Sequence, residues 1–298
     1  MLEFKVPEIS DKHWVDKCFE FAHSMNCEYT FGTQYIWHTA YRTQISRYND
    51  FFICRWGKGS DMAYSLPIGN GDFKNAVLQI IEDARQNNVI PKFYGVTENY
   101  KRMLNEYFSD NITYYYDDGD NDYIYNAVDL ANLSGKKYHS KRNHITNFKK
   151  NNPDWNFEII NESNINECIE LHSDWIENKD ENDSDYSLEF ESVLTGFENY
   201  SELGFFGGLI RIGGKAVAYT YGEQHDKDCF VTHFEKAPAD IQGAYAIINQ
   251  EFAKVLVEKG YKFINREEDL GIEGLRKAKQ SYHPTVWLKK EVAVFDRL

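Results

Sequence analysis

One short segment of the sequence is dense in groups that could bind or activate a ligand. An apolar run, residues 261–264, leads directly into it, and Gly271 then lets the chain turn. In open α/β folds, ligands lie beyond the carboxyl ends of strands, so this segment is the first candidate for a site. A loop whose charges only pair with one another is the alternative. The segment consists of Asn265, Arg266, Glu267, Glu268 and Asp269.

The residues after this loop predict a helix with a basic side. Ile272 and Leu275 stand at helical spacing and predict its buried face, and Pro284 ends the helix. Arg276 and Lys279 are three residues apart, on adjacent parts of one helix face. Guanidinium and ammonium groups both pair well with phosphate. We therefore expect these two side chains to bind a phosphate-bearing ligand.

A second basic group is found in residues 136–150, which contain six lysines and arginines and no acid. Ile145 and Phe148 predict an apolar stripe on a helix, with Lys141 and Arg142 beside that stripe. This local reversal of charge predicts an anion site for phosphate at Lys141 and Arg142. The alternative is a basic linker helix that docks on an acidic neighbour.

The acidic stretch near residue 120 has part of the spacing of a calcium loop. Counted from Asp118, acids occupy the first, third, fifth and twelfth positions, but the sixth is Tyr123, where an EF-hand needs glycine. The flanking residues also predict strands rather than helices. We therefore expect a solvated turn between strands, and no metal ligands in this chain.

Composition and charge narrow the class of protein. The net charge of −14 argues against a protein that wraps nucleic acid, DNA included, or lies broadly on an anionic membrane. No apolar run approaches the roughly 18–20 residues that span a bilayer, and the first residues lack the pattern of a signal peptide. The five cysteines are scattered without metal-type spacing. A cytoplasmic protein with reduced thiols, no transmembrane segment and an undetermined oligomeric state is expected.

The predicted elements alternate between helices and strands in both halves of the chain. The Asn151–Trp155 stretch breaks a helix and is the best boundary by composition. In the first half we expect helices before residue 42 (the second over 31–42), strands over 50–56 and 62–68, a helix over 73–87 capped by Asp72, a strand over 92–96 and a helix over 98–108. In the second half we expect strands over 155–160, 205–212, 215–223, 228–235 and 286–295, helices over 164–178, 188–203 and 243–259, and an acidic loop over 178–185.

Several segments together resemble a bacterial family described as phosphatidylglycerol lysyltransferase C-terminal-domain-like. The resemblance covers nearly the whole chain and is carried by DYIYNAVDLANLSGKKYHSKRNHITNFKK, FEKA, GAYAIINQEF and NREEDLGIEGLRKAKQSYHP. It implies an α+β fold with mixed α/β sheets, built from two tandem GNAT-like domains. The implied domains are 1–133, a degenerate GNAT-like domain; 134–153, a basic interdomain helix; and 154–298, the C-terminal GNAT-like domain.

The same resemblance implies an acyl- or aminoacyl-transferase with a small-molecule donor and acceptor. Typical GNAT enzymes cradle the pyrophosphate of CoA with a glycine-rich loop, of which Gln242 and Gly243 keep only part. CoA or acyl-CoA is therefore expected as a co-substrate and not as a tightly bound cofactor. More distant relatives, the lysyltransferases and the peptidoglycan-bridge aminoacyltransferases, use aminoacyl-tRNA, so tRNA is the alternative donor. The missing membrane segments argue against lipid lysylation.

In a GNAT-like site, donor and acceptor would meet where the central strands separate, and general acid–base catalysis would assist the transfer. Glu235 ends the third strand near that point and is the first candidate for the base, with an ion pair to Lys236 as the alternative. We expect His233 to be a buried histidine with satisfied nitrogens. Tyr282 is the candidate acid, and Glu267 is a second candidate base. The expected binders of the acceptor are Asn265, Arg266, Glu268 and Asp269.

Two other functions fit the sequence. A non-catalytic, ligand-binding duplicate of the GNAT fold would explain the reduced glycine loop at Gly243. A structural or partner-binding protein would need a large apolar surface patch. No Ser/His/Asp or Cys/His arrangement stands out, so a covalent intermediate is not indicated.

Overall fold

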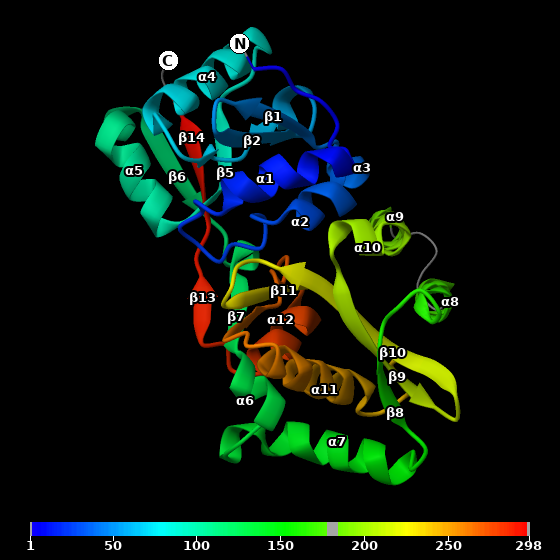
Figure 1. Ribbon diagram of the computed structural model, residues 1–298. Helices are drawn as coiled ribbons and strands as arrows, with labels where there is room; N and C mark the ends of the chain where they lie inside the picture. The colour runs from blue at the N-terminus through cyan, green and yellow to red at the C-terminus, as the bar shows by residue number, and fades with distance from the viewer. Residues whose placement is uncertain (1, 178–183, 297–298) are drawn as a thin grey trace. The chain divides into compact units, whose positions relative to one another are not determined.

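The computed structural model of the protein describes residues 2–177 and 184–296, and most of the acidic loop predicted over 178–185 lies outside them (Figure 1). The chain forms two compact units. Unit 1 consists of Met1–Asp122, Glu268–Glu273 and Trp287–Leu298, and unit 2 of Tyr123–Glu267 and Gly274–Val286. Each unit contains one mixed sheet with helices packed on it.

Sheet A belongs to unit 1 and has the strand order β1-β2-β3-β5-β14-β6, with β4 paired to β2. The β3–β5 pair is parallel and the other pairs are antiparallel, so the sheet is mixed. The predicted strand over 62–68 is broken into two short strands. The strands are β1 (Gln44–Tyr48), β2 (Phe51–Trp56), β3 (Ala63–Tyr64), β4 (Ile68–Gly69), β5 (Lys92–Val96), β6 (Ile112–Tyr116) and β14 (Glu291–Phe295).

The helices of unit 1 follow the predicted pattern closely. The helix that begins at Phe73 is capped by Asp72, whose side chain accepts from the backbone N–H of Asn75, as expected. The helix predicted over 31–42 is interrupted at Trp37. The helices are α1 (Lys12–Phe19), α2 (Phe31–Ile36), α3 (His38–Tyr41), α4 (Phe73–Gln86) and α5 (Glu98–Phe108).

Sheet B has the strand order β13-β7-β12-β11-β10-β9-β8, and its β11–β12 pair is parallel. The predicted hairpin is confirmed, because Gly213 and Gly214 join two antiparallel strands. Both glycines have positive φ. The strands are β7 (Asp122–Asn126), β8 (Asn156–Ile159), β9 (Phe206–Ile212), β10 (Lys215–Gln224), β11 (Cys229–Lys236), β12 (Phe263–Asn265) and β13 (Val286–Leu288).

Helices cover sheet B with apolar faces that the sequence predicts well. Ile145 and Phe148, the predicted stripe of the basic helix, are buried in one core cluster with strand residues such as Ile210 and Phe230. Figure 1 shows the long orange helix α11 lying along the sheet near α6 and α7. The helices are α6 (Ala127–Asn132), α7 (His139–Asn151), α8 (Ile165–Glu177), α9 (Ser184–Glu198), α10 (Tyr200–Leu203), α11 (Ala244–Glu258) and α12 (Glu273–Gln280).

The last strand corrects the sequence-based prediction. We expected one strand over 286–295 that completes the sheet of the second half, but β14 lies between β5 and β6 in sheet A. Conversely, β7 comes from the first half of the chain but pairs with β12 in sheet B. An apolar alternation predicts that a strand is buried, but it does not specify which strand lies beside it.

The helix α12 also differs from expectation. Ile272 and Leu275, the predicted buried face, are 56% and 36% exposed, whereas Lys279 is only 7% exposed. The Lys279 ammonium donates to the backbone carbonyl of Arg266, which satisfies it inside unit 2. Because α12 spans only eight residues, two turns of apolar spacing were too little evidence for its buried face.

None of the helices in residues 2–177 and 184–296 combines the length and the apolar character that crossing a bilayer requires.

Candidate functional site

Two parallel strands of unit 2 separate toward their carboxyl ends. The β11–β12 ladder runs from Cys229 opposite Phe263 to Val231 opposite Asn265. Strand β11 then continues to Lys236 without β12 beside it. Such a gap at the carboxyl end of parallel strands is where α/β folds usually bind ligands. The side chains at this gap form the candidate site.

The first group at the gap is a histidine held between two carboxylates. His233 Nδ1 lies 2.9 Å from Glu267 Oε1, and its Nε2 lies 3.0 Å from Glu223 Oε1. Burial by itself lowers the pKa of His233, but the two carboxylates outweigh this and raise it to about 9. The ring is therefore an imidazolium at neutral pH that donates through both nitrogens. The expectation of a buried histidine with satisfied nitrogens is confirmed.

The second group is an ion pair between β11 and the end of β12. Arg266 Nη2 donates to Glu235 Oε1 at 2.8 Å, and Asn249 Nδ2 donates to Glu235 Oε2 at 3.1 Å. Glu235 is thus ion-paired, as the alternative interpretation expected, but with Arg266. The expected partner, Lys236, pairs instead with Glu189.

Two cations lie close to an aromatic ring beside this pair. Lys141 Nζ lies 3.8 Å from the ring centre of Tyr282, and Arg266 Cζ lies 5.0 Å from the same centre. Burial, and then the charge of Arg266, lowers the pKa of Lys141 to about 8. Burial also raises the pKa of Tyr282, so its hydroxyl stays protonated. The structure therefore brings together four predicted site residues: Glu235, Arg266, Lys141 and Tyr282.

Arg142 and Gly243 have packing roles in the structure. The Arg142 guanidinium donates to the carbonyls of Leu133 and Gly135, just beyond the end of α6. Gly243 has a φ of 88°, and a Cβ there would lie 2.6 Å from the carbonyl oxygen of His144 in α7. The glycine thus lets α7 pack closely against the start of α11. Gln242, beside it, is exposed.

Much of the loop after β12 is used to hold its own turns. The Asn265 side chain accepts from the backbone N–H of Glu267 at 2.7 Å, and Asp269 accepts from that of Gly271 at 2.8 Å. Both Asn265 and Asp269 are fully buried. In α12, Arg276 is half-buried whereas Lys279 is buried. Proximity in sequence therefore did not give these polar groups a common environment.

Glu268 belongs to a separate buried cluster in unit 1. Lys290 Nζ lies 2.8 Å from Asp122 Oδ1 and also contacts the Glu268 carboxylate. Cys27 and Glu28 complete the surroundings, with Cys27 Sγ 3.9 Å from the Lys290 ammonium. Burial would lower the pKa of Lys290, but the neighbouring acidic groups raise it well above its usual value.

This cluster was also considered as a metal site. Ligand atoms of Cys27, Asp122 and Glu268 lie within 4.8 Å of one another. The Lys290 ammonium already contacts both carboxylates, so the cluster contains a cation of its own.

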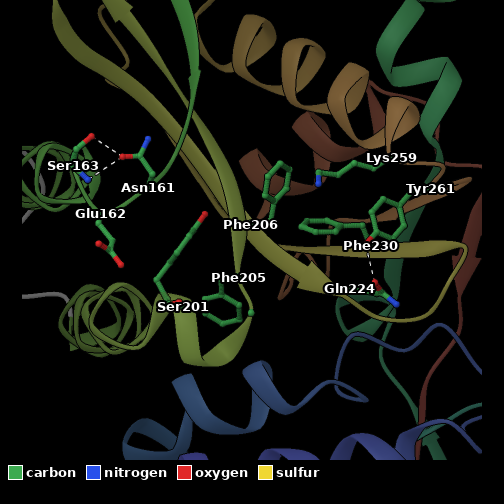
Figure 2. A pocket seen from close by; sticks show the side chains of 12 residues that line it. Asn161, Glu162, Ser163, Ser201, Phe205, Phe206, Gln224, Phe230, Lys259 and Tyr261 are labelled. Atoms are coloured by element: carbon green, nitrogen blue, oxygen red, sulfur yellow. Dashed lines mark hydrogen bonds between the residues drawn. The ribbon is translucent and has the colours of Figure 1, made fainter.

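A surface pocket of about 840 Å³ lies elsewhere in unit 2. Figure 2 shows Phe206, Phe230, Tyr261 and Lys259 on one side of it. Its residues from β10 and β11 come from the strand ends opposite Glu235, and its lining includes none of the predicted site residues. The charged gap between β11 and β12 therefore remains the better candidate site.

Three residues at these clusters were missed from the sequence. Glu223 and Asn249 hold His233 and Glu235, and Lys290 neutralises the cluster of unit 1. Glu223 offered a signal, because a carboxylate at the end of an apolar strand needs a partner when buried. Lys290 offered none, because its partners lie far away in the sequence.

The comparisons with known proteins agree on one family. Residues 19–294 match the family model described as "Phosphatidylglycerol lysyltransferase, C-terminal". A conserved protein of unknown function from Bacteroides thetaiotaomicron is 37% identical, with a TM-score of 0.93 over 99% of this chain and 100% of that chain. A search of curated proteins found no match.

More distant structures share the fold. L-PGS from Bacillus licheniformis is 17% identical, with a TM-score of 0.68 over 99% of this chain and 95% of that one. An acetyltransferase of the GNAT family from Colwellia psychrerythraea is 13% identical, with a TM-score of 0.53 over 99% and 100% of the two chains. The chain therefore has a mixed α/β fold that is similar to GNAT structures.

Proposed function

Because the chain belongs to the family of the phosphatidylglycerol lysyltransferase C-terminal domain, we propose that it is an acyl- or aminoacyl-transferase. It would move an acyl group from a phosphate-bearing donor to an amine or hydroxyl acceptor at the gap between β11 and β12. The observation that carries this proposal is the meeting of Glu235, Arg266, Lys141 and Tyr282, drawn from four separate segments.

Each of these groups has a role in the proposed transfer. Glu235 accepts the proton of the attacking amine or hydroxyl, and the neutral Tyr282 hydroxyl supplies a proton to the leaving group. Lys141 and Arg266 bind the negative charge of the donor. His233 and Glu267 bridge the base of the gap and hold the chain after β12 in position.

The packing at Gly243 favours aminoacyl-tRNA over CoA as the donor. In a CoA-binding loop, glycines let backbone amides approach the pyrophosphate at a helix N-terminus. At the start of α11, the space beside Gly243 is taken by the backbone of α7. The net charge of −14 limits any tRNA footprint to local basic groups such as those of α7. Acyl-CoA is the second candidate donor.

We also propose that the chain is a tandem pair of GNAT-like domains, 1–133 and 154–298, joined by the basic segment 134–153. The presence of one mixed sheet in each compact unit supports this proposal. In such a pair, β7 and β14 are exchanged between the two sheets.

Thermal unfolding with CoA, acetyl-CoA and bulk tRNA in parallel tests the donor. A ligand that binds only the native state raises the melting temperature, by an amount that grows with its concentration over Kd. We expect a shift with bulk tRNA that weakens with added salt. A shift with CoA alone would reassign the donor, and no shift with any of them would support the second function below.

Replacement of Glu235 tests the base. Glu235→Gln keeps the shape of the side chain but cannot accept the proton, so we expect transfer to slow by roughly 10²- to 10⁴-fold. Glu198→Gln, an exposed glutamate of α9, is the control. Unchanged transfer by Glu235→Gln would remove Glu235 from the mechanism.

A non-catalytic ligand-binding duplicate of the fold is the second candidate function. The observation in its favour is that two side-chain pairs, His233–Glu267 and Glu235–Arg266, bridge the gap in which the donor would lie. Ligand binding without turnover in single-turnover assays would favour this function.

A further inference from the structure

The charges around the Tyr282 ring do not balance. Lys141 and Arg266 are both cations near this ring, and Glu235 is the carboxylate paired with Arg266. Within the described ranges, the Lys141 ammonium lies over the ring of Tyr282 and forms no salt bridge, although the charge of Glu235 acts favourably on it. The cluster therefore carries an excess positive charge in a place partly removed from water. Such an excess is costly unless an anion joins it.

Hydrogen-bonding capacity is also left over in this cluster. Arg266 Nη1 is buried, and no described residue accepts a hydrogen bond from it. Burial raises the pKa of Tyr282, so its hydroxyl stays protonated and can donate a hydrogen bond. Buried polar groups in native proteins are nearly always satisfied, so an unmade bond here indicates a missing partner.

We propose that Lys141, Arg266 and Tyr282 form a binding site for one phosphate group. Three donors of different kinds, from α7, the loop after β12 and the chain after α12, suit an anion with several oxygens. Guanidinium and ammonium groups are the usual partners of phosphate in proteins. Glu235, held by Arg266 Nη2 and Asn249 Nδ2, leaves Arg266 Nη1 available for this anion.

The phosphate deepens the proposed function but does not depend on it. If the chain is a transferase, the group belongs to the donor or the acceptor, both of which can carry a phosphodiester. If it is a binding protein, the same site holds its ligand. Phosphate binding and acyl transfer are therefore measured separately.

Calorimetric titration with inorganic phosphate is the first test. We compare the wild type with Lys141→Met, which keeps much of the side-chain length but removes the ammonium, and with Lys150→Met, an exposed lysine of the same helix. Loss of one charge-assisted contact should weaken binding roughly 10-fold. We expect this loss for Lys141→Met and wild-type binding for Lys150→Met. Equal binding by all three proteins overturns the proposal.

A second measurement follows the Lys141 ammonium directly in the wild-type protein. In protein labelled with ¹³C at lysine Cε, Lys141 should titrate near pH 8, below the usual value for a lysine. Bound phosphate stabilises the ammonium, so its midpoint should move upward by roughly one pH unit or more. The spectrum of Lys141→Met assigns the signal. A midpoint that stays fixed at saturating phosphate contradicts the site.

Two larger ligands then identify the source of the phosphate. Glycerophosphoglycerol represents the headgroup of the lipid for which the family is named, and AMP represents the 3′ end of a tRNA. If one of these ligands binds more tightly than phosphate, and this binding is lost in Lys141→Met, the result supports the site and identifies its ligand. Binding of both that is unaffected by Lys141→Met overturns it, whatever the transfer assays show.

Discussion

Lys290 and Lys141 are both withdrawn from water, but their surroundings act on their charges in opposite directions. Lys290 lies among carboxylates, which raise its pKa well above the usual value. Lys141 lies over an aromatic ring near Arg266, and its pKa falls to about 8. The first lysine is therefore a permanent structural cation. The second has the properties expected of a group that meets an anionic ligand.

Removal of the Lys290 ammonium should destabilise the protein strongly. Lys290→Met leaves Asp122 and Glu268 without their cation, and breaking a buried pair in this way costs about 3–5 kcal/mol. Lys289→Met is the control: Lys289 is exposed and pairs with Glu291, a kind of contact worth about 0–1 kcal/mol. Urea unfolding of the two variants measures the difference. Equal losses would show that the cluster is not the structural centre of unit 1.

His233 should make stability depend on pH in the alkaline range. Its pKa is about 9 in the folded protein against 6.5 for a free histidine, so folding favours the protonated ring. The stabilisation is complete below about pH 6.5 and is lost as the pH rises through 9. In His233→Gln this contribution is absent. We expect the difference in unfolding free energy between the two proteins to shrink from pH 6 to pH 9.5.

Lys141 does not affect the comparison between the wild type and His233→Gln. Its lowered pKa gives a dependence of the opposite sign, but it is present in both proteins and cancels in the difference. A wild-type advantage that stays constant over the pH range would mean that the Glu223 and Glu267 contacts do not hold a proton on the ring.

At the scale of elements, the packing of α7 gives Gly243 a structural role that the sequence motif did not predict. Residues 242–243 suggest part of a phosphate loop in the sequence, yet in the fold Gly243 lies against the backbone of α7. Gly243 therefore allows close packing between α7 and the start of α11. The basic residues of α7 contribute at a different point, through Lys141.

The packing of α7 on α11 can be tested with two alanines. Both Gly243 and Gly214 have positive φ, but a Cβ at Gly243 meets the carbonyl oxygen of His144 at 2.6 Å, whereas nothing lies within 4 Å of one at Gly214. Gly214→Ala should cost about 1–2 kcal/mol for its backbone conformation. Gly243→Ala should cost about 1–3 kcal/mol more, because α7 must move. Equal losses in urea unfolding would show that the two helices are not tightly packed there.

At the scale of the whole molecule, the C-terminal strand ties distant parts of the chain together. Strand β14 fills the position between β5 and β6, so sheet A is complete only when the last residues of the chain have joined it. Helix α5 and its neighbours are synthesised much earlier. The fold of unit 1 therefore depends on contacts between residues 92–116 and 291–295, which are far apart in the sequence.

A truncation tests this dependence. A protein that ends at Lys290 lacks β14, so β5 and β6 lose the ladder between them. We expect their backbone amides to lose protection in hydrogen exchange. Addition of a synthetic peptide with residues 286–298 should restore it in part. Full protection of β5 and β6 in the truncated protein would contradict the role of β14.

The sequence determined the local structure of this protein. The Asp72 cap, the Gly213-Gly214 hairpin and the buried side of α7 are all present as predicted. Each rests on a short-range rule: a cap bonds to the next turn, a positive φ suits glycine, and an apolar stripe is buried. The family and the mixed sheets also follow from patterns along the chain.

Only the tertiary structure decided which side chains and which strands pair with one another. That Glu235 pairs with Arg266, that Lys290 joins Asp122 and that β14 enters sheet A all depend on residues far apart in the sequence. The charged loop 265–269 was the right place to look, yet its members serve three different environments. The burial, the ion pairs and the pKa of a side chain depend on which groups replace water around it. These groups come together only when the chain is packed.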